Sequence, residues 1–447
     1  AIEYEEVVGY HLEEAYLYRD ELGVVGEPDR ALAREAAERL GRAARRAFVR
    51  SDAPAGINLI SRAAVLLPPD DPERVELVPN VRVIQGMNGD LGWAEKVLTE
   101  AIEAAATTGD RRLAATALVQ RAFFRLFTEA DVTAEELIDA ARRAIGVFEV
   151  LGDDLGLARA WRLTAQAHYL GRRAAACADA SERALEHARR AGDVFEQREI
   201  LEWLAIALFL GPTPAAEAAH RCELLLEQTE GDLVLDVHIL GALAFLVAMQ
   251  GQLEQARELT TRGRRLMEQL GDWIWVYSWH FAAINLWQGD PVAAEQELLP
   301  AYEALKKLGE KSHFSTMAHG LASAAYMQGR YDDANQFTHE CEDAARPNDV
   351  YSGIIWRSIR AKVLARKGEL AAAEQLALHA VALARDSDFL IAHADALLDL
   401  AEVHILAGKP AAAAAAAIDE AIHYYEQKGN LLAVHKAQAM LEERAQP

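Results

Sequence analysis

The sequence predicts an all-α protein, an α-solenoid of about nine or ten helix pairs, on three observations. Hydrophobic residues make up 51% of the 447 residues but aromatic residues only 7%, so the apolar mass is mostly aliphatic and alanine, as in close-packed helices. Short turns of the Gly-Asp type recur every 38 to 43 residues, which is the mark of a repeat array. Small residues also stand at fixed offsets from a second glycine in most periods.

Each Gly-Asp turn is predicted to end one helix and begin the next. A glycine just past a helix can take the left-handed conformation that closes its last turn. The side chain that follows can accept hydrogen bonds from the free N–H groups of the next helix. The series is Gly109-Asp110, Gly152-Asp153, Gly192-Asp193, Gly231-Asp232, Gly271-Asp272, Gly309-Glu310, Asn348-Asp349, Ser387-Asp388 and Gly429-Asn430.

The second glycine, about halfway through each period, is predicted to separate an A helix before it from an antiparallel B helix after it. It is Gly89, Gly251, Gly289, Gly329 or Gly368 in the clearest units. Small residues at fixed helical offsets would let neighbouring backbones approach closely. They are Ala94, Ala256, Ala294, Ala334 and Ala373 at plus five, Ala101, Gly263, Ala301, Cys341 and Ala380 at plus twelve, and Ala244, Ala282, Ala322, Ala361 and Ala401 seven residues before the later glycines.

Three proline-containing segments interrupt this regularity. The run from Pro68 to Pro72 predicts a rigid connection between early units. Gly211-Pro212-Thr213-Pro214 replaces a normal tight turn, and Pro300 predicts a kink or local break within a B helix. Without a flexible Gly/Ser linker, we expect residues 1–30 to form a capping or junction helix and residues 31–447 to form one continuous array.

The order small, Gly, large, Ala, small at these offsets is similar to the tetratricopeptide repeat. The period here is longer than the family's 34 residues, which implies helices lengthened by a few residues each. The resemblance implies a right-handed superhelix whose A helices line a concave binding surface. Long-period arrays of this kind resemble the C-terminal region of bacterial signal-transduction ATPases and of adenylate/guanylate-cyclase-linked regulators. The stretch from Tyr4 to Tyr16 resembles the junction that follows their ATPase and winged-helix modules.

Charge and cysteine content narrow the partners that we expect. The 46 basic and 69 acidic residues give a net charge of −23, which argues against nucleic-acid binding and against a polybasic membrane anchor. The longest apolar stretch, from Ile239 to Met249, is too short to span a bilayer. Three scattered cysteines favour a reduced, cytoplasmic protein. The chain begins without Met, so we expect it to be a trimmed piece of a longer protein.

No catalytic motif is recognisable, so we expect no enzyme activity, no cofactor and no metal. The sequence contains no GxxxxGK[ST] phosphate loop, no HExxH and no GxSxG. Its cysteines lack the spacing of a zinc site. An α-helical hydrolase is the remote alternative. It would need a closed ring and an aromatic-lined cleft, and the repeat offsets favour an open solenoid.

Candidate binding residues follow from the family's register, in which inward positions lie 13, 10, 9, 6, 3 and 2 residues before each mid-repeat glycine. The segment from Trp273 to His280 stands out: three tryptophans in seven residues cannot all face one core, so one or two are expected at the groove or at a contact surface. Wide packing between long helices is the alternative. The candidates are Arg162, Tyr169, Arg198, His238, Phe245, Trp279, His280, Trp287, His319 and Tyr326.

For the polar candidates a structural explanation competes with the functional one. Ordinary hydrogen-bonded or exposed histidines account for His238, His280 and His319 better than ligand contacts do, and their offsets do not suit a metal site. The arginines could bind a carboxylate or phosphate, although exposed solubilising arginines explain them better.

The resulting hypothesis is a scaffold or sensor domain that binds a protein or peptide in its concave groove, as the regulatory arm of a bacterial signalling ATPase. The alternative is a small-molecule sensor that recognises an inducer or a sugar-like ligand on the clustered aromatic residues.

Overall fold

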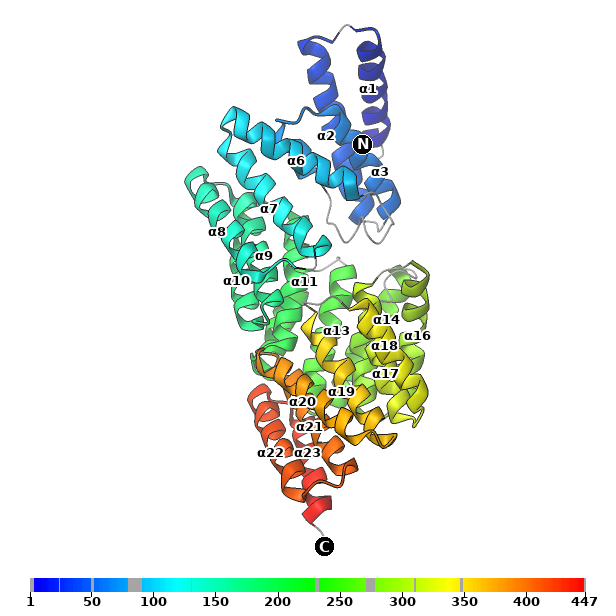
Figure 1. The fold of residues 1–447 in the computed structure, drawn as a ribbon. Helices are drawn as coiled ribbons and strands as arrows, with labels where there is room; N and C mark the ends of the chain where they lie inside the picture. Colours follow the sequence, from blue (N-terminus) through cyan, green and yellow to red (C-terminus); the bar gives the residue numbers. More distant parts are fainter. Residues whose placement is uncertain are drawn as a thin grey trace. The chain divides into compact units, whose positions relative to one another are not determined.

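The computed structural model describes residues 4–23, 25–49, 52–78, 91–129, 131–229, 233–270, 278–308, 311–345 and 349–445. These residues form 22 α-helices and no β-strand, so the predicted all-α class is confirmed (Figure 1). Contacts divide the chain into unit 1 (Ala1–Leu163) and unit 2 (Thr164–Pro447), and each is described by itself. The division expected from the sequence, into a capping or junction helix over residues 1–30 and an array over residues 31–447, stays a prediction. No described helix has the length and apolarity needed to cross a membrane.

Unit 1 is built from helices that pack against their neighbours along the chain. Two buried clusters fill the spaces between them, and alanine makes up much of both, so the backbones lie close together. The helices are α1 (Tyr4–Glu21), α2 (Glu27–Val49), α3 (Ala53–Leu66), α4 (Pro72–Glu76), α6 (Leu91–Thr108), α7 (Arg111–Thr128) and α8 (Ala134–Leu151). The boundary between the units falls inside α9 (Asp154–Leu170).

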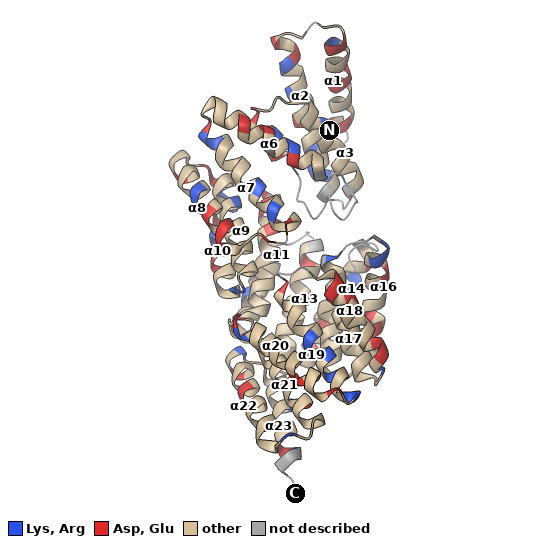
Figure 2. Ribbon diagram, in the orientation of Figure 1, with Lys and Arg blue, Asp and Glu red and all other residues tan. Residues whose placement is uncertain are grey.

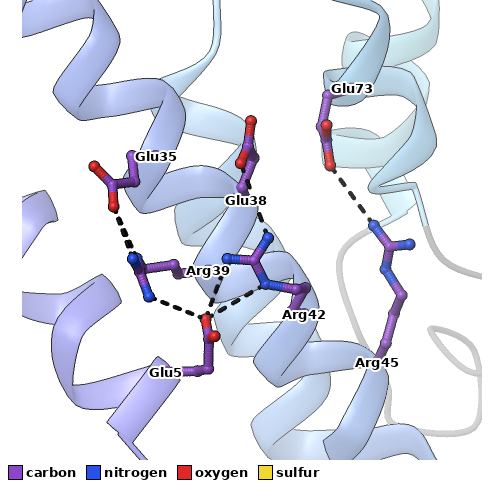
Figure 3. A network of polar contacts seen from close by, with 7 residues as sticks. All are labelled: Glu5, Glu35, Glu38, Arg39, Arg42, Arg45 and Glu73. Carbon is purple, nitrogen blue, oxygen red and sulfur yellow. Dashed lines mark hydrogen bonds and ion pairs between the residues drawn. The ribbon is translucent and has the colours of Figure 1, made fainter.

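Ion pairs connect the helices of unit 1 at their surfaces (Figure 3). The carboxylate of Glu5 on α1 lies 3.5 Å from the guanidinium of Arg39 and 3.2 Å from that of Arg42, both on α2. Arg45 of α2 pairs with Glu73 of α4 at 3.6 Å. Because water reaches these side chains, each pair stabilises the fold by about 1 kcal/mol at most. The buried alanine and leucine clusters therefore hold unit 1 together, and the ion pairs orient its helices.

Unit 2 repeats the A and B helix pair. Each helix packs on the next along the chain, and the A helices α11, α13, α15, α17, α19 and α21 also contact one another in sequence. Its helices are α10 (Ala174–Ala191), α11 (Val194–Leu210), α12 (Ala215–Gln228), α13 (Leu233–Met249), α14 (Leu253–Leu270), α15 (Ser278–Trp287), α16 (Pro291–Leu308), α17 (Ser312–Met327), α18 (Tyr331–Ala344), α19 (Val350–Arg366), α20 (Leu370–Arg385), α21 (Leu390–Leu406), α22 (Ala411–Lys428) and α23 (Leu431–Ala445).

The A and B helices differ in charge as their positions require. In Figure 2, α13 is almost free of charged residues, and Asp236 is the only one in its sequence. α14, its partner B helix, carries acidic and basic residues along one face. A helix that is apolar on all sides must be covered on all sides. α13 is covered by helices on either side, since it packs against α11, α12, α14 and α15.

The predicted turn chemistry is confirmed at most of the turns that the described residues include, and Asp388 is the exception treated below. Gly109, Gly152 and Gly192 have φ between 64° and 73°, the left-handed region that closes a helix. The side chains of Asp110, Asp153, Asp193, Asp349 and Asn430 each accept a hydrogen bond from the N–H three residues ahead, at 2.9 to 3.1 Å. Gly231-Asp232, Gly271-Asp272, Gly309-Glu310 and Asn348 lie outside the described residues.

The small residues at fixed offsets form the buried contacts between helices, as predicted. The alanines at plus five and at minus seven are all fully buried. At plus twelve, Gly263 lies against the Phe281 ring so closely that a Cβ atom would come within 2.5 Å of its Cζ. Of the kink or local break expected at Pro300, the break is wrong, since α16 runs unbroken from Pro291 to Leu308, and the kink stays a prediction.

Unit 2 departs from the expected open solenoid because its last helices return to contact its first ones. We call these contacts the closure seam. The sequence pattern predicts that Asp388 caps the helix that follows it, but in the structure it does not. Its carboxylate instead accepts hydrogen bonds from the N–H groups of Ala174 and Ala175 at the start of α10, at 2.6 and 3.0 Å. Arg173 donates to the carbonyl of Asp386 at 3.0 Å.

Lys428 completes the closure seam from the end of α22. Its side chain is fully buried, and its ammonium donates to the carbonyl oxygens of Leu208, Gly211 and Thr213 at 2.9, 2.7 and 2.8 Å. The irregular Gly211-Pro212-Thr213-Pro214 segment turns these carbonyls away from helical hydrogen bonding, so they are free to accept. Burial lowers the pKa of Lys428 to about 7. The helices from α10 to α23 thus form one closed turn of the array.

Candidate ligand-binding cavity

A cavity of about 240 Å³ lies inside the closed turn of unit 2. The helices that line it are α13, α15, α17, α19, α21 and α23, the A helices of successive pairs and the final helix. This placement follows from the repeat, because each A helix presents the same face inward. Since the last helices pack back on the first, helices border the cavity on several sides, and it remains partly open to solvent.

One wall of the cavity is aromatic. Phe245 and Trp287 have ring centroids 3.9 Å apart at 34° to each other, and Phe209 supports Phe245 edge-on from behind at 4.6 Å. Trp279 lies edge-on to His319 at 4.6 Å. Flat, rigid side chains of this kind give a ligand apolar contact area at low entropic cost.

The opposite end of the cavity is charged and comes from α19, α21 and α23. Four charged residues line the cavity: Lys362, Asp395, Asp399 and Lys436. The ammonium of Lys362 lies 2.7 Å from the carboxylate of Asp399. The carboxylate of Asp395 accepts a hydrogen bond from the Tyr425 hydroxyl at 2.5 Å and stays accessible from the cavity.

The enclosure perturbs the protonation of these groups. Burial raises the pKa of Asp395 to about 6, helped by the negative charge of Asp399 and opposed by the Tyr425 hydrogen bond and the two lysines. Burial also raises the pKa of Asp399, against the pull of Lys362. Burial alone would lower the pKa of Lys362, but the carboxylates of Asp399 and Glu402 outweigh it and raise that pKa. Perturbed carboxyl groups in a cavity are typical of a functional site.

Four of the ten residues chosen from the sequence line the cavity: Phe245, Trp279, Trp287 and Tyr326. The Tyr326 hydroxyl donates to Glu402 at 2.5 Å and accepts from Arg366 at 3.2 Å, so it is held at the charged end. Their role in binding stays a prediction. Trp273 and Trp275, the other tryptophans of the cluster, lie outside the described residues.

Four more of the ten pack behind the cavity wall. His238 and His280 lie edge-on to each other at 5.7 Å, and both are buried. Tyr169 packs against Trp203 and Phe389 at 5.2 and 5.9 Å. His319 is fully buried between aromatic rings, and neither ring nitrogen has a hydrogen-bond partner among the described residues. Burial lowers its pKa to about 3, so the ring is neutral.

The two arginine candidates do not line the cavity. Arg162 is buried with its guanidinium 4.2 Å from the centroid of the Phe123 ring, and Arg198 is half-buried. The three candidate histidines form no metal centre, because no cluster of His, Cys, Asp and Glu in the described part of the chain is arranged to hold a metal ion. The basic spot proposed for these arginines therefore lies apart from the cavity.

The charged end of the cavity was not among the candidates, although the repeat register contains it. Counted back from Gly408, the offsets of 13, 10 and 9 fall on Asp395, Leu398 and Asp399, and all three line the cavity. Counted back from Gly368, the offset of 6 falls on Lys362. The repeat register therefore identifies the charged end of the cavity. Aromatic composition alone, which singled out the segment around Trp279, does not identify it.

The described residues form a helical-repeat fold of the tetratricopeptide type, with paired helices, a period near 40 residues and buried small residues at the repeat offsets. No family model matches the chain, and no curated protein matches it. The solved structures that it resembles include the following three. One is a Rap protein complexed with competence and sporulation factor, at 13% identity and a TM-score of 0.46, covering 83% of this chain and 97% of that one.

The second solved structure is a signal transduction ATPase with numerous domains and a tetratricopeptide repeat sensor, from Pyrococcus horikoshii. The identity is 13% and the TM-score 0.41, and the match covers 86% of this chain and 62% of that one. The third is the APC/C hetero-tetramer Cut9-Hcn1, at 10% identity and a TM-score of 0.39, covering 99% of this chain and 96% of that one.

Proposed function

We propose that the chain is a non-enzymatic sensor module in which the cavity of unit 2 takes a short peptide or a small molecule. The observation that carries this proposal is the cavity itself, enclosed by a closed turn of the array and bounded by an aromatic wall and a charged end. Small-molecule sites in proteins combine a concave apolar surface with a few placed polar groups. The cavity has both.

The size of the cavity selects among the partners expected from the sequence. About 240 Å³ is room for roughly eight water molecules. That space suits a small organic molecule, or the end or one or two side chains of a peptide. A protein partner would reach it with a protruding segment.

Binding is favoured over catalysis by where the carboxylates lie. Asp395 and Asp399 are one turn apart on the same helix, α21, so they flank a ligand from one side. Glycoside hydrolysis needs two carboxyl groups on opposite sides of the scissile bond. The Lys362 ammonium at 2.7 Å also neutralises Asp399, which suits a structural or binding role.

A signalling role rests on the long-period array and its resemblance to the regulatory arm of bacterial signalling ATPases. The closed turn supplies a two-state element for such a role, since the closure seam can be made or broken. A ligand that contacts helices on both sides of the cavity binds the closed form better, and this differential affinity shifts the equilibrium towards it. The cytoplasmic location expected from the sequence belongs to the same proposal.

The test is a thermal-shift screen of the full chain against short peptides and metabolites, followed by calorimetry on the hits. We expect Trp279→Ala and Trp287→Ala to weaken binding of a hit at least tenfold, because they remove the aromatic wall. Trp161→Ala, outside the cavity, is the matched control and should bind normally. Hits that bind both cavity variants as tightly as the wild type would show that the site lies elsewhere.

A further inference from the structure

The charged residues of the cavity do not all neutralise one another. Lys362 is paired with Asp399 at 2.7 Å, and Glu402, just beyond, is paired with Arg366 at 3.0 Å. Asp395 and Lys436 form no ion pair with any described residue. One negative and one positive group thus face the cavity without an ionic partner.

These two groups lie near each other without touching. Asp395 lies on α21 and Lys436 on α23, which comes after α22 at the C-terminal end of the array. The ammonium of Lys436 acts electrostatically on both Asp395 and Asp399, but no ion pair within 4.0 Å joins it to either. Lys436 is exposed, and Asp395 has a single described hydrogen-bond partner, Tyr425. Both groups line the cavity, so a ligand held there would meet a carboxylate and an ammonium that form no ion pair with a described side chain.

Together with the aromatic wall, these charges specify the kind of molecule that fits. A cationic ligand would pair with Asp395 but would be repelled by Lys436, and an anionic ligand would meet the reverse problem. A ligand with both charges satisfies both residues. An apolar group on the same ligand would displace water from Phe245, Trp279 and Trp287.

We propose that the unit 2 cavity binds a small zwitterion with an apolar side group, such as a free hydrophobic α-amino acid or a dipeptide. Its ammonium pairs with Asp395, its carboxylate pairs with Lys436, and its side chain packs on Phe245 and Trp287. This inference rests on the proposed function and narrows the ligand to one chemical class.

The experiment is titration calorimetry of the full chain with leucine, phenylalanine and tryptophan, with the dipeptide Leu-Leu, and with blocked forms of each. N-acetylation removes the ammonium and amidation removes the carboxylate. We expect each block to weaken binding at least tenfold, because it breaks a charge-assisted contact. Comparing the affinities of the free amino acids with that of the dipeptide shows how far apart the two charges of the ligand must be.

Two variants assign each charge to its residue. In Lys436→Gln the free and amidated ligands should bind equally well, and in Asp395→Asn the free and N-acetylated ligands should bind equally well. Asp419→Asn and Lys307→Gln, at exposed positions outside the cavity, are the matched controls and should bind like the wild type. Circular dichroism of every variant checks that it is folded.

The outcomes separate this inference from the proposed function. Blocked ligands that bind as well as free ones, or a panel of amino acids and dipeptides with no binder, would overturn the zwitterion proposal. The proposed function would survive either result if another compound from the screen bound in a way that depends on Trp287. It would fail if no compound from the wider screen did.

Discussion

Asp395, which we propose to bind the ligand, lowers the stability of the folded protein near neutral pH. The carboxylate lines the cavity beside a second carboxylate, so its charged form is disfavoured and its pKa rises to about 6. Near neutral pH the folded protein therefore holds a charge that the unfolded chain carries more easily. Natural proteins keep such residues where function requires them, at the expense of stability.

This cost predicts that Asp395→Asn makes unit 2 more stable near pH 8. Because the folded pKa is above the unfolded value of 3.8, wild-type stability falls as the pH rises from about 4 to 6, and then stays low. Asparagine stands in for the protonated form at all pH values and can still accept from Tyr425. We expect a gain on the order of 1 kcal/mol, since cavity water screens part of the effect.

Urea denaturation at pH 8 and at pH 4 measures this difference. The advantage of Asp395→Asn should be present at pH 8 and absent at pH 4. An equal advantage at both values would mean that packing, and not charge, separates the two proteins. Asp419→Asn, which is exposed, should match the wild type throughout.

At the scale of single elements, glycines within helices separate packing from helix propensity. Gly263 lies in the middle of α14, where a Cβ atom would come within 2.5 Å of the Phe281 ring. Gly146 lies in α8 with no atom within 4 Å of a Cβ position. The same substitution should therefore have opposite signs at the two sites.

We expect Gly146→Ala to stabilise the protein by about 0.5 to 1 kcal/mol, because alanine is the better helix former. Gly263→Ala should destabilise it by about 1 to 3 kcal/mol, because the fully buried Phe281 cannot move aside. Thermal unfolding of both variants tests the pair. A Gly263→Ala protein as stable as the wild type would mean that the contact between α14 and α15 is looser than described.

The elements were predictable from the sequence because their signals are local. A glycine that closes a helix and an acidic residue that begins the next act within a few residues of each other, and Asp110, Asp153 and Asp193 all do so. Asp388 occupies the same place in the pattern but caps α10, more than 200 residues earlier in the chain. Nothing local distinguishes it, so its true partner could not be predicted.

At the scale of the molecule, the stacking of helix pairs was predictable and the closed turn was not. Stacking repeats the same contact between neighbours and so leaves a period in the sequence. The closure seam occurs once and leaves none. The cavity was therefore predictable only in part. Its aromatic wall was recognised from composition, whereas the charged end becomes a site only when α21 and α23 return to complete the turn.

Lys428 offers a direct test of the closure seam. Lys428→Met leaves three carbonyl oxygens without their donor, so unit 2 should lose about 1 to 3 kcal/mol of stability at pH 9. The pKa of Lys428 is about 7 when folded and 10.5 in its ordinary state, so folding releases a proton between these values. Wild-type stability therefore rises with pH in this range, and the loss should be about 1 to 2 kcal/mol smaller at pH 7.

Urea denaturation at pH 7 and pH 9 compares the wild type with Lys428→Met, and Lys409→Met is the control. Lys409 is an exposed lysine paired with Glu374 at 2.9 Å, so removing it should matter little and equally at both pH values. A loss in Lys428→Met that does not depend on pH would show that burial in the closure seam does not lower the pKa of Lys428.

The hydrogen bonds from Lys428 also bear on how unit 2 comes apart. An open array can unfold one helix pair at a time from its end, because each pair contacts only its neighbours. Here α22 cannot detach without uncovering the carbonyls of Leu208, Gly211 and Thr213 in and just after the last turn of α11, so the C-terminal pairs should unfold only together with the first ones. Exchange of amide hydrogens should therefore be slow even near the C-terminal end, and the helices from α10 to α23 should unfold together.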